Sequence, residues 1–433
     1  MTVKFRMTHN TMFNQTKLKN GIKVILSPQT STRAVSVLVM VKVGSRFESA
    51  KNNGASHFVE HLLFKGTKKR PSTLEISQEL DSIGADYNAF TSKEKTGYYI
   101  KAESSNLNLA VDMLSDMISN SIFDPKEVER ERGTILEEIN MYEDNPMSKI
   151  ADFFEEDLYG KSSALGRHVI GTKTTIQSMK QKELIKYWQK HYHSSNIIIS
   201  IAGNFIQKKA VKLLEDGFGD INKGPQNKAK EKANHNKLPE FSTHYKETSQ
   251  AHLILGFPGL DIDHKDRYAL GVFANILGGN MSSRLFIQVR ERLGLCYFIR
   301  ASTDLMEKAG SFLIQAGLDL KKIDKALRAI SNEIRDIKKN GVSQQELTKS
   351  KQYIKGKMAL SQEDSLDISS FYAEQVMFHS KILTPDEVFS KVEKITLKDV
   401  SRVANSILKR NRVVLSTLSP FKDTKKFGKH LNF

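Results

Sequence analysis

At 433 residues the chain exceeds the size of one ordinary hydrophobic core, and usual domain lengths predict about two to four domains. Hydrophobic residues make up 39% and charged residues 27%, as in globular proteins, and no apolar run reaches the ~18 residues of a membrane-spanning helix. The net charge of +17 comes from scattered lysines, without a basic block interleaved with aromatic residues. We therefore expect no membrane span and no nucleic-acid partner.

The N-terminus and the cysteine content indicate a compartment. Residues 1–6 are not followed by an apolar segment, so the sequence shows no secretory signal. The single cysteine, Cys296, excludes an internal disulfide and fits a reducing environment. We expect a cytoplasmic protein.

The first half of the chain, residues 1–221, mixes strand and helix patterns. Asn20-Gly21 between two alternating segments predicts a hairpin, and residues 34–45 form a β-branched run typical of a buried strand. By period and turn signals, the other strands are predicted at 87–91, 97–100 and 195–203, and helices at 55–64, 72–83, 107–121, 124–142 and 180–190.

The second half, residues 239–433, begins the same plan again after a linker at 222–238. The linker is rich in lysine and asparagine and has almost no large apolar side chain. The second half has predicted strands at 251–257 and 412–418, with a helix at 268–277 and further long helices between them. The order of elements predicts a duplicated α+β protein in which each half is a sheet covered by helices.

The helix at 55–64 carries a candidate metal motif. His57 and His61 are four residues apart, so both imidazoles leave the same face of the helix, with Glu60 beside them. Two imidazoles suit zinc, and a third protein ligand leaves one position for water, whose proton a neighbouring carboxylate can take. The order His-x-x-Glu-His is the inverse of the commoner zinc-protease motif. No such motif follows the first strand of the second half.

A third ligand has to come from elsewhere, and the helix at 124–142 offers several carboxylates. Asp124 and Pro125 predict where this helix begins. Glu131 and Glu138 are seven residues apart, two helical turns, and therefore share a face. Glu137 is adjacent, and spacing alone does not separate it from Glu138.

Three stretches closely resemble the M16 family of zinc peptidases. They are residues 57–67, His-Phe-Val-Glu-His-Leu-Leu-Phe-Lys-Gly-Thr; residues 88–92, Asn-Ala-Phe-Thr-Ser; and residues 129–139, which hold the carboxylates. The likeness spans essentially the whole chain. The best match is the M16B subfamily, which includes the mitochondrial processing peptidase β subunit and single-chain bacterial relatives. The resemblance implies a LuxS/MPP-like metallohydrolase fold, in which the two halves face each other across a cavity.

The resemblance also assigns the metal and the base. His57 and His61 match the two zinc histidines, and Glu60 matches the general base that activates the water. Glu138 matches the third ligand of one Zn²⁺ per chain, and we prefer it to Glu137 because the Glu-Arg-Glu-Arg-Gly stretch then aligns in register.

Further residues are implied to support catalysis or to bind substrate. Glu131 matches a second acidic residue that supports the catalytic site without binding zinc. Asn88 and Ala89 lie where the family holds the substrate backbone against a strand edge. Arg290 and Tyr297 match residues of the second half that contact the substrate near the scissile bond, where they could donate hydrogen bonds to a carbonyl or an oxyanion.

The resulting prediction is a zinc-dependent endopeptidase that hydrolyses unfolded or short peptides through a metal-activated water. Because family members of this length pair with a second copy or a related subunit, a homodimer or an M16 heterodimer is expected. The alternative is a non-catalytic partner subunit or scaffold of the same fold.

Overall fold

The structure is a computed structural model that describes residues 12–229, 233, 235, 238, 241–423 and 425–433. The N-terminal residues used for the signal prediction and part of the predicted linker 222–238 lie outside the described residues. The chain forms two compact units. Unit 1 holds the described parts of Met1–Ile139, His168–Lys228 and Ala359–Thr384, and unit 2 holds those of Asn140–Arg167, Ala229–Met358 and Pro385–Phe433.

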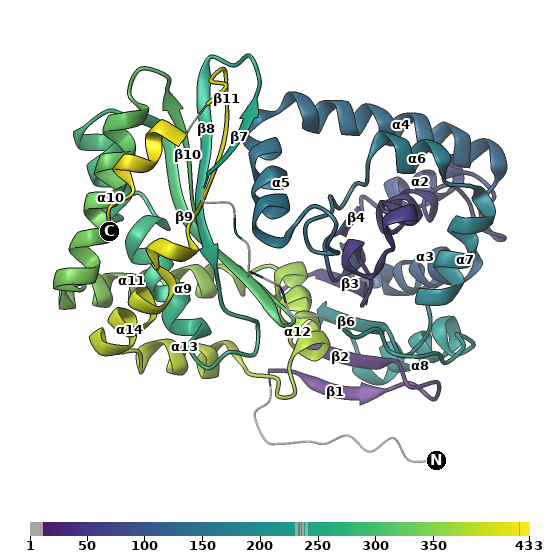
Figure 1. The fold of residues 1–433 in the computed structure, drawn as a ribbon. Coiled ribbons are helices and arrows are strands. Elements are labelled where there is room, and N and C mark those ends of the chain that lie inside the picture. Colours follow the sequence, from purple (N-terminus) through teal and green to yellow (C-terminus); the bar gives the residue numbers. More distant parts are fainter. Residues whose placement is uncertain (1–11, 230–232, 234, 236–237, 239–240, 424) are drawn as a thin grey trace. The chain divides into compact units, whose positions relative to one another are not determined.

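Unit 1 contains a mixed six-stranded sheet (Figure 1). In the order in which they pair, its strands are β1 (Asn14–Lys17), β2 (Lys23–Pro28), β6 (Ile197–Gly203), β3 (Ala34–Val41), β5 (Thr96–Glu103) and β4 (Asp86–Thr91). Only β2 and β6 run parallel; every other neighbouring pair is antiparallel. The predicted hairpin is confirmed, since β1 and β2 pair on either side of Asn20-Gly21. The last strand in this order, β4, pairs only with β5 and is therefore an edge strand of the sheet.

Both faces of this sheet are covered, which explains the continuous apolar sequence of β3. Val35, Val37 and Val39 point into one core, together with side chains of the helices that follow β3. Leu38 and Met40 point into a second core, formed with α12 (Ser365–Phe378). Because successive side chains of a strand alternate between faces, a strand covered on both sides needs apolar residues at nearly every position.

The five helices predicted in the first half of the chain are confirmed within a few residues, and two further helices, at 173–178 and 207–218, were not predicted. The helices of unit 1 are α1 (Ala55–Leu62), α2 (Thr73–Ser82), α3 (Leu107–Asn120), most of α4 (Pro125–Asp144), α6 (Lys173–Ser178), α7 (Gln181–His191), α8 (Gln207–Phe218) and α12. The predicted start of α4 is confirmed, because Asp124 accepts hydrogen bonds from the N–H groups of Lys126 and Glu127 at 2.8 and 3.3 Å.

Unit 2 repeats the plan with a five-stranded sheet. Its strands pair in the order β7 (Phe241–Tyr245), β11 (Val414–Ser419), β8 (Gln250–Pro258), β10 (Ala309–Asp319) and β9 (Cys296–Met306). Its helices are α5 (Pro146–Tyr159), α9 (Arg267–Gly278), α10 (Ile323–Asn340), α11 (Gln344–Ser361), α13 (Pro385–Glu393) and α14 (Leu397–Ile407). The long hairpin β9–β10 is an element that sequence reasoning did not identify.

Without β1, the sheet of unit 1 has the same topology as the sheet of unit 2. The order β2-β6-β3-β5-β4 matches β7-β11-β8-β10-β9, including the single parallel pair. This agreement confirms the predicted α+β class with two related, helix-covered sheets. The sequence predicts contiguous halves, whereas each unit takes one helix from the other half: α12 packs in unit 1 and α5 in unit 2. The predicted cavity between the halves stays a prediction.

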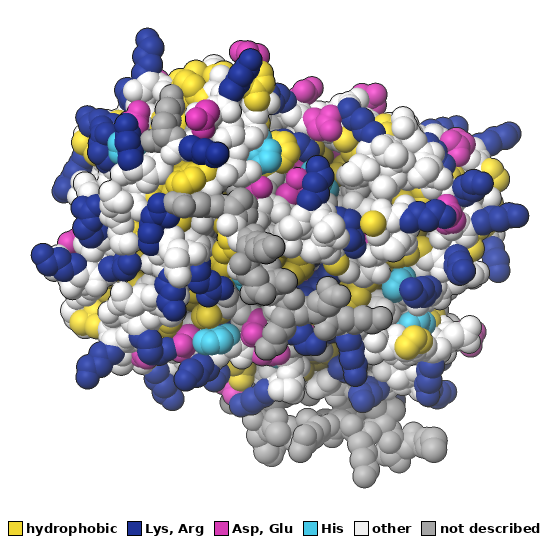
Figure 2. Space-filling view, in the orientation of Figure 1, with side chains coloured by type: hydrophobic (Ala, Val, Ile, Leu, Met, Phe, Trp, Pro, Cys, Tyr) yellow, Lys and Arg dark blue, Asp and Glu magenta, His cyan; other side chains and the backbone are white. Residues whose placement is uncertain are grey.

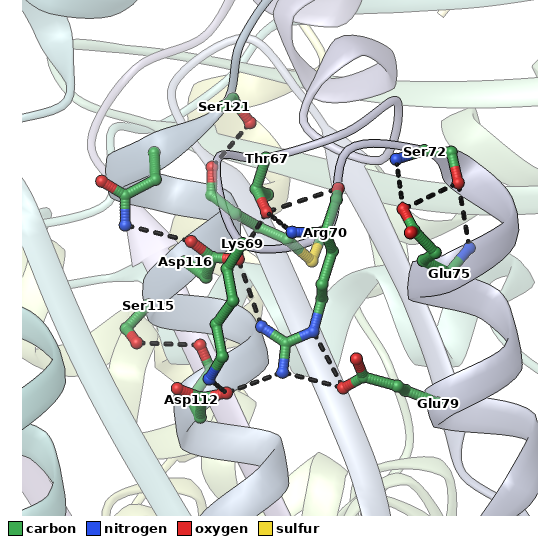
Figure 3. Close-up of polar contacts among 12 residues, drawn as sticks. Thr67, Lys69, Arg70, Ser72, Glu75, Glu79, Asp112, Ser115, Asp116 and Ser121 are labelled. Carbon is green, nitrogen blue, oxygen red and sulfur yellow. Dashed lines mark hydrogen bonds and ion pairs between the residues drawn. The ribbon is translucent and has the colours of Figure 1, made fainter.

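The buried side chain of Arg70 connects the loop that follows α1 to two neighbouring helices (Figure 3). The guanidinium of Arg70 contacts Asp112 at 2.7 Å and Asp116 at 3.1 Å, both on α3. It also contacts Glu79 on α2 at 2.8 Å. The side chain of Arg70 is only 4% exposed, and a charge so buried is stable only with such partners. The C-terminal end of α1 is therefore anchored to α2 and α3.

The charge distribution on the surface and the composition of the helices concern the predictions about nucleic acid and membranes. On the face in Figure 2, lysine and arginine side chains are spread widely and interleaved with acidic and uncharged ones. Within the described residues, no helix is both long and apolar enough to cross a membrane. The compartment and the lack of a nucleic-acid partner stay predictions.

Candidate metal centre

The candidate centre is built on α1, a short helix with one apolar side and one polar side. Phe58, Val59 and Leu62 are fully buried against the sheet of unit 1. On the other side, His57, Glu60 and His61 are partly buried. Because residues three and four apart share a helix face, the sequence spacing brings these polar groups together.

The structure brings Glu138 of α4 to the two histidines. The Nε2 atoms of His57 and His61 lie 3.3 Å apart, and Glu138 Oε2 lies 3.5 Å from the first and 3.6 Å from the second. These atoms form the one group of potential metal ligands found in the described part of the chain. Glu137 is exposed on α4 and is not part of this group. The geometry thus favours Glu138 where spacing alone left two choices.

Burial dominates the electrostatics of this trio. Burial, aided by the neighbouring His61, lowers the pKa of His57 to about 3, so its imidazole is neutral at ordinary pH. Burial also raises the pKa of Glu138. The buried Nδ1 of His57 has no hydrogen-bond partner among the described residues, which leaves Nε2 as the atom directed at Glu138. Two neutral imidazoles and one carboxylate are a donor set that zinc accepts.

Glu131 orients His61 through the ring nitrogen that does not face Glu138. Its Oε2 accepts a hydrogen bond from His61 Nδ1 at 3.0 Å, and its Oε1 pairs with Lys65 at 2.8 Å. Burial opposes ionisation, but the hydrogen bonds from His61 and Lys65 outweigh it and lower the pKa of Glu131. Because a carboxylate only accepts, the proton of His61 sits on Nδ1 and the lone pair of Nε2 faces Glu138.

Glu60 has a separate anchor on β4. Thr91 donates its hydroxyl to Glu60 Oε2 at 2.5 Å. Burial raises the pKa of Glu60, while Thr91 and His61 act in the opposite direction. Thr91 and Lys65 are site residues that sequence reasoning did not single out, although both lie inside the stretches that carry the family resemblance.

Asn88 and Ala89 lie on β4, the edge strand. Ala89 is paired with Tyr98 of β5 in the strand register, yet its N–H donates to the side-chain oxygen of Asn88 at 2.8 Å. Asn88 itself is exposed. The edge therefore presents a backbone donor whose partner is the exposed side chain of Asn88.

Arg290 and Tyr297 lie together in unit 2. Arg290 is in the π-helical turn Phe286–Arg292, and its guanidinium stacks over Phe286 at 4.6 Å and Tyr297 at 5.5 Å. Tyr297, on β9, is 77% exposed. The structure brings these two residues to each other, and their contact with substrate stays a prediction.

The sequence matches two family models that together cover most of the chain. Insulinase (Peptidase family M16) matches residues 23–173, and Peptidase M16 inactive domain matches residues 178–354. The chain is 36% identical over 413 residues to the uncharacterized zinc protease YmxG of Bacillus subtilis, with 94% of this chain and 98% of that protein covered. It is 33% identical to the uncharacterized zinc protease SCO5738 of Streptomyces coelicolor, covering 94% and 90%.

Solved structures agree in fold. A protease from Helicobacter pylori superposes with a TM-score of 0.89 at 23% identity, covering 94% of this chain and 99% of that one. A peptidase M16 inactive domain from Pseudomonas fluorescens gives a TM-score of 0.88 at 19% identity, covering 94% and 98%. With two family models matched in sequence along most of its length, the chain belongs to peptidase family M16.

Proposed function

We propose that the protein is a zinc-dependent endopeptidase acting on unfolded or short peptides. The observation that carries this proposal is the meeting of His57, His61 and Glu138, with Glu131 behind His61. The relatives from Bacillus subtilis and Streptomyces coelicolor are named zinc proteases, which supports the same reading.

His57, His61 and Glu138 are the residues that would hold one zinc ion per chain. The neutral state of His57 and the fixed tautomer of His61 each leave a lone pair available, as a metal ligand requires. A bound zinc ion supplies Lewis acidity, which polarises a carbonyl oxygen and makes water a stronger acid.

Glu60 is the proposed general base. It neighbours His61 in the sequence and lies on the polar side of α1, and its Oε2 is held by Thr91. In the proposed reaction the carboxylate takes a proton from the attacking water and returns it to the leaving amine. Glu131 does not move a proton in this scheme, since it holds the Nδ1 proton of His61.

The edge strand β4 supports the choice of substrate. A peptide added as a further strand would accept the Ala89 N–H in place of the Asn88 side chain. Only an extended backbone can pair in this way, so folded segments are excluded. In this proposal Arg290 and Tyr297 donate hydrogen bonds to the peptide near the scissile bond.

The test compares the wild type with Glu60→Gln. We expect about one zinc per chain by elemental mass spectrometry, and cleavage products by mass spectrometry from a mixed pool of unstructured peptides. Glu60→Gln should keep the zinc and lose about 10²–10⁴-fold in rate, because general-base catalysis contributes about that much. An undiminished rate in this variant contradicts the proposed role of Glu60.

The second candidate is a non-catalytic partner subunit. It is favoured by the match of residues 178–354 to an M16 inactive domain. It predicts zinc without cleavage, and cleavage only after a related M16 subunit is added. Native mass spectrometry of the purified chain, alone and with such a subunit, separates a homodimer from a heterodimer.

A further inference from the structure

The N-terminal end of α1 is capped from a distance by Glu48. This residue lies in the loop between β3 and α1, and it is 5% exposed. Its Oε1 accepts from the Ser56 N–H at 2.7 Å, and its Oε2 accepts from the Gly54 N–H at 2.7 Å. The side chain of Asn53 donates a third hydrogen bond to Oε2 at 2.9 Å.

The residue at the N-cap position of α1 cannot cap the helix with a side chain. Gly54 has no side chain, and its φ of +96° places it in the left-handed region that favours glycine. A Cβ there would also lie 2.8 Å from the carbonyl oxygen of Ile170. The first N–H groups of a helix lack partners within the helix, so without Glu48 they would be buried and unpaired. A carboxylate also complements the positive end of the helix dipole.

The loop that carries Glu48 is itself fixed to the β4–β5 turn. Arg46 forms a buried ion pair with Glu94 at 2.5 Å, and its N–H donates to the carbonyl of Lys93 at 2.9 Å. This turn directly follows Thr91, which holds Glu60. Glu48 is therefore a buried side chain on a loop that is held at a second point, beside the β4–β5 turn.

We propose that Glu48 is a positioning residue of the metal centre, whose carboxylate fixes the first turn of α1 and so preorganises His57 and His61. The inference rests on the proposed zinc site. Ser56, whose N–H Glu48 binds, immediately precedes His57 in that turn. When this turn frays, metal binding has to reorder it first, and affinity falls.

A matched control is available in the same unit. Asp364 caps α12 by accepting from the N–H groups of Leu366 and Asp367 at 2.7 and 3.3 Å. The helix α12 packs against the opposite face of the sheet from α1. Asp364→Ala therefore removes a carboxylate cap and destabilises the unit without touching α1.

The experiment measures Zn²⁺ affinity of the metal-free protein by competition with a chromophoric chelator, and hydrogen exchange of a peptide covering residues 54–62. We expect Glu48→Ala to weaken zinc binding about 10–100-fold, as loss of residues behind metal ligands does, and to speed exchange in α1. Glu48→Gln keeps the volume and one acceptor and should be intermediate. Asp364→Ala should change zinc affinity by no more than about twofold, as expected for a distant site.

Two results overturn the inference: Glu48 variants that bind zinc as the wild type does, or an Asp364→Ala protein that loses as much affinity. If Glu48→Ala does not fold, Glu48→Gln decides. Wild-type protein without zinc affinity refutes the proposed function and the inference with it, whereas normal wild-type binding with unaffected Glu48 variants refutes the inference alone.

Discussion

The helices α1 and α9 occupy the same place in the two units, each following the central strand of its sheet, β3 or β8. They are built differently. Nine of the twelve residues of α9 are buried, and seven of them belong to the hydrophobic core of unit 2. In α1, three of the eight residues are the partly buried polar groups His57, Glu60 and His61.

This difference shows what a helix with the proposed metal ligands requires beyond a hydrophobic face. Packing dominates in α9, and Asp266, which precedes it, makes no side-chain cap but pairs with Arg402 of α14. The helix α1 buries polar side chains, and each of them has a cost unless it finds a partner. Its partners come from other elements: Glu131 for His61, Thr91 for Glu60, and Glu48 for the first turn.

The largest expected effect is the loss of zinc from His61→Ala. Removing one of three ligands leaves too few donors, and the described part of the chain holds no second set of such ligands. Elemental mass spectrometry should find zinc falling from about one per chain to near zero. His252→Gln in β8, a partly buried histidine of unit 2, is the control and should keep its zinc. An undiminished zinc content in His61→Ala would contradict the assigned site.

A substitution in the buried face of α9 should lower the stability of the protein rather than its zinc content. Phe273 is fully buried and stacks on Phe312 of β10, with ring centres 5.2 Å apart. Phe273→Ala should lower the free energy of unfolding by about 3–5 kcal/mol through the cavity that it creates, and leave zinc affinity unchanged. Urea unfolding followed by circular dichroism measures the first and chelator competition the second. Met281→Ala, at a 71% exposed position, should change neither. Weaker zinc binding in Phe273→Ala would mean that α9 also supports the metal.

A smaller loss is expected for Glu131→Gln. The amide removes the negative charge that holds the Nδ1 proton of His61, so zinc affinity should fall about 10–100-fold while the fold persists. The matched control is Glu129→Gln on the same helix, whose carboxylate is exposed and pairs with Arg132. If the two variants bind zinc equally well, Glu131 does not orient His61.

Much of this arrangement can be predicted from the sequence, because it rests on local patterns. The spacing of His57 and His61 placed them on one face of α1, and Asp124 predicted where α4 begins. The choice of Glu138 on that helix came from the family resemblance. The exchange of α5 and α12 between units could not be predicted, because an apolar helix face does not specify which sheet it will cover.

Residues that act through other residues are the hardest to find. Glu48 precedes α1 by seven positions, and only the folded loop brings its carboxylate to the Ser56 N–H. Thr91 is typical of any strand, and its hydroxyl reaches Glu60 only because β4 lies beside α1. Such contacts depend on tertiary structure, and no spacing rule in the sequence encodes them.

Thr91→Val tests the smallest of these contacts. Valine keeps the shape of the side chain and removes the hydroxyl that donates to Glu60 Oε2. Because a hydrogen bond to a charged group is worth about 1.5–3 kcal/mol, peptide cleavage should slow by about 10–100-fold, with zinc affinity unchanged. The hydroxyl also lowers the pKa of Glu60, so its loss raises that pKa and moves the acid side of the pH–rate profile to higher pH. Thr91→Ser, which restores the donor, should recover the rate, and a Thr91→Val protein with a wild-type profile would show that Glu60 needs no anchor on β4.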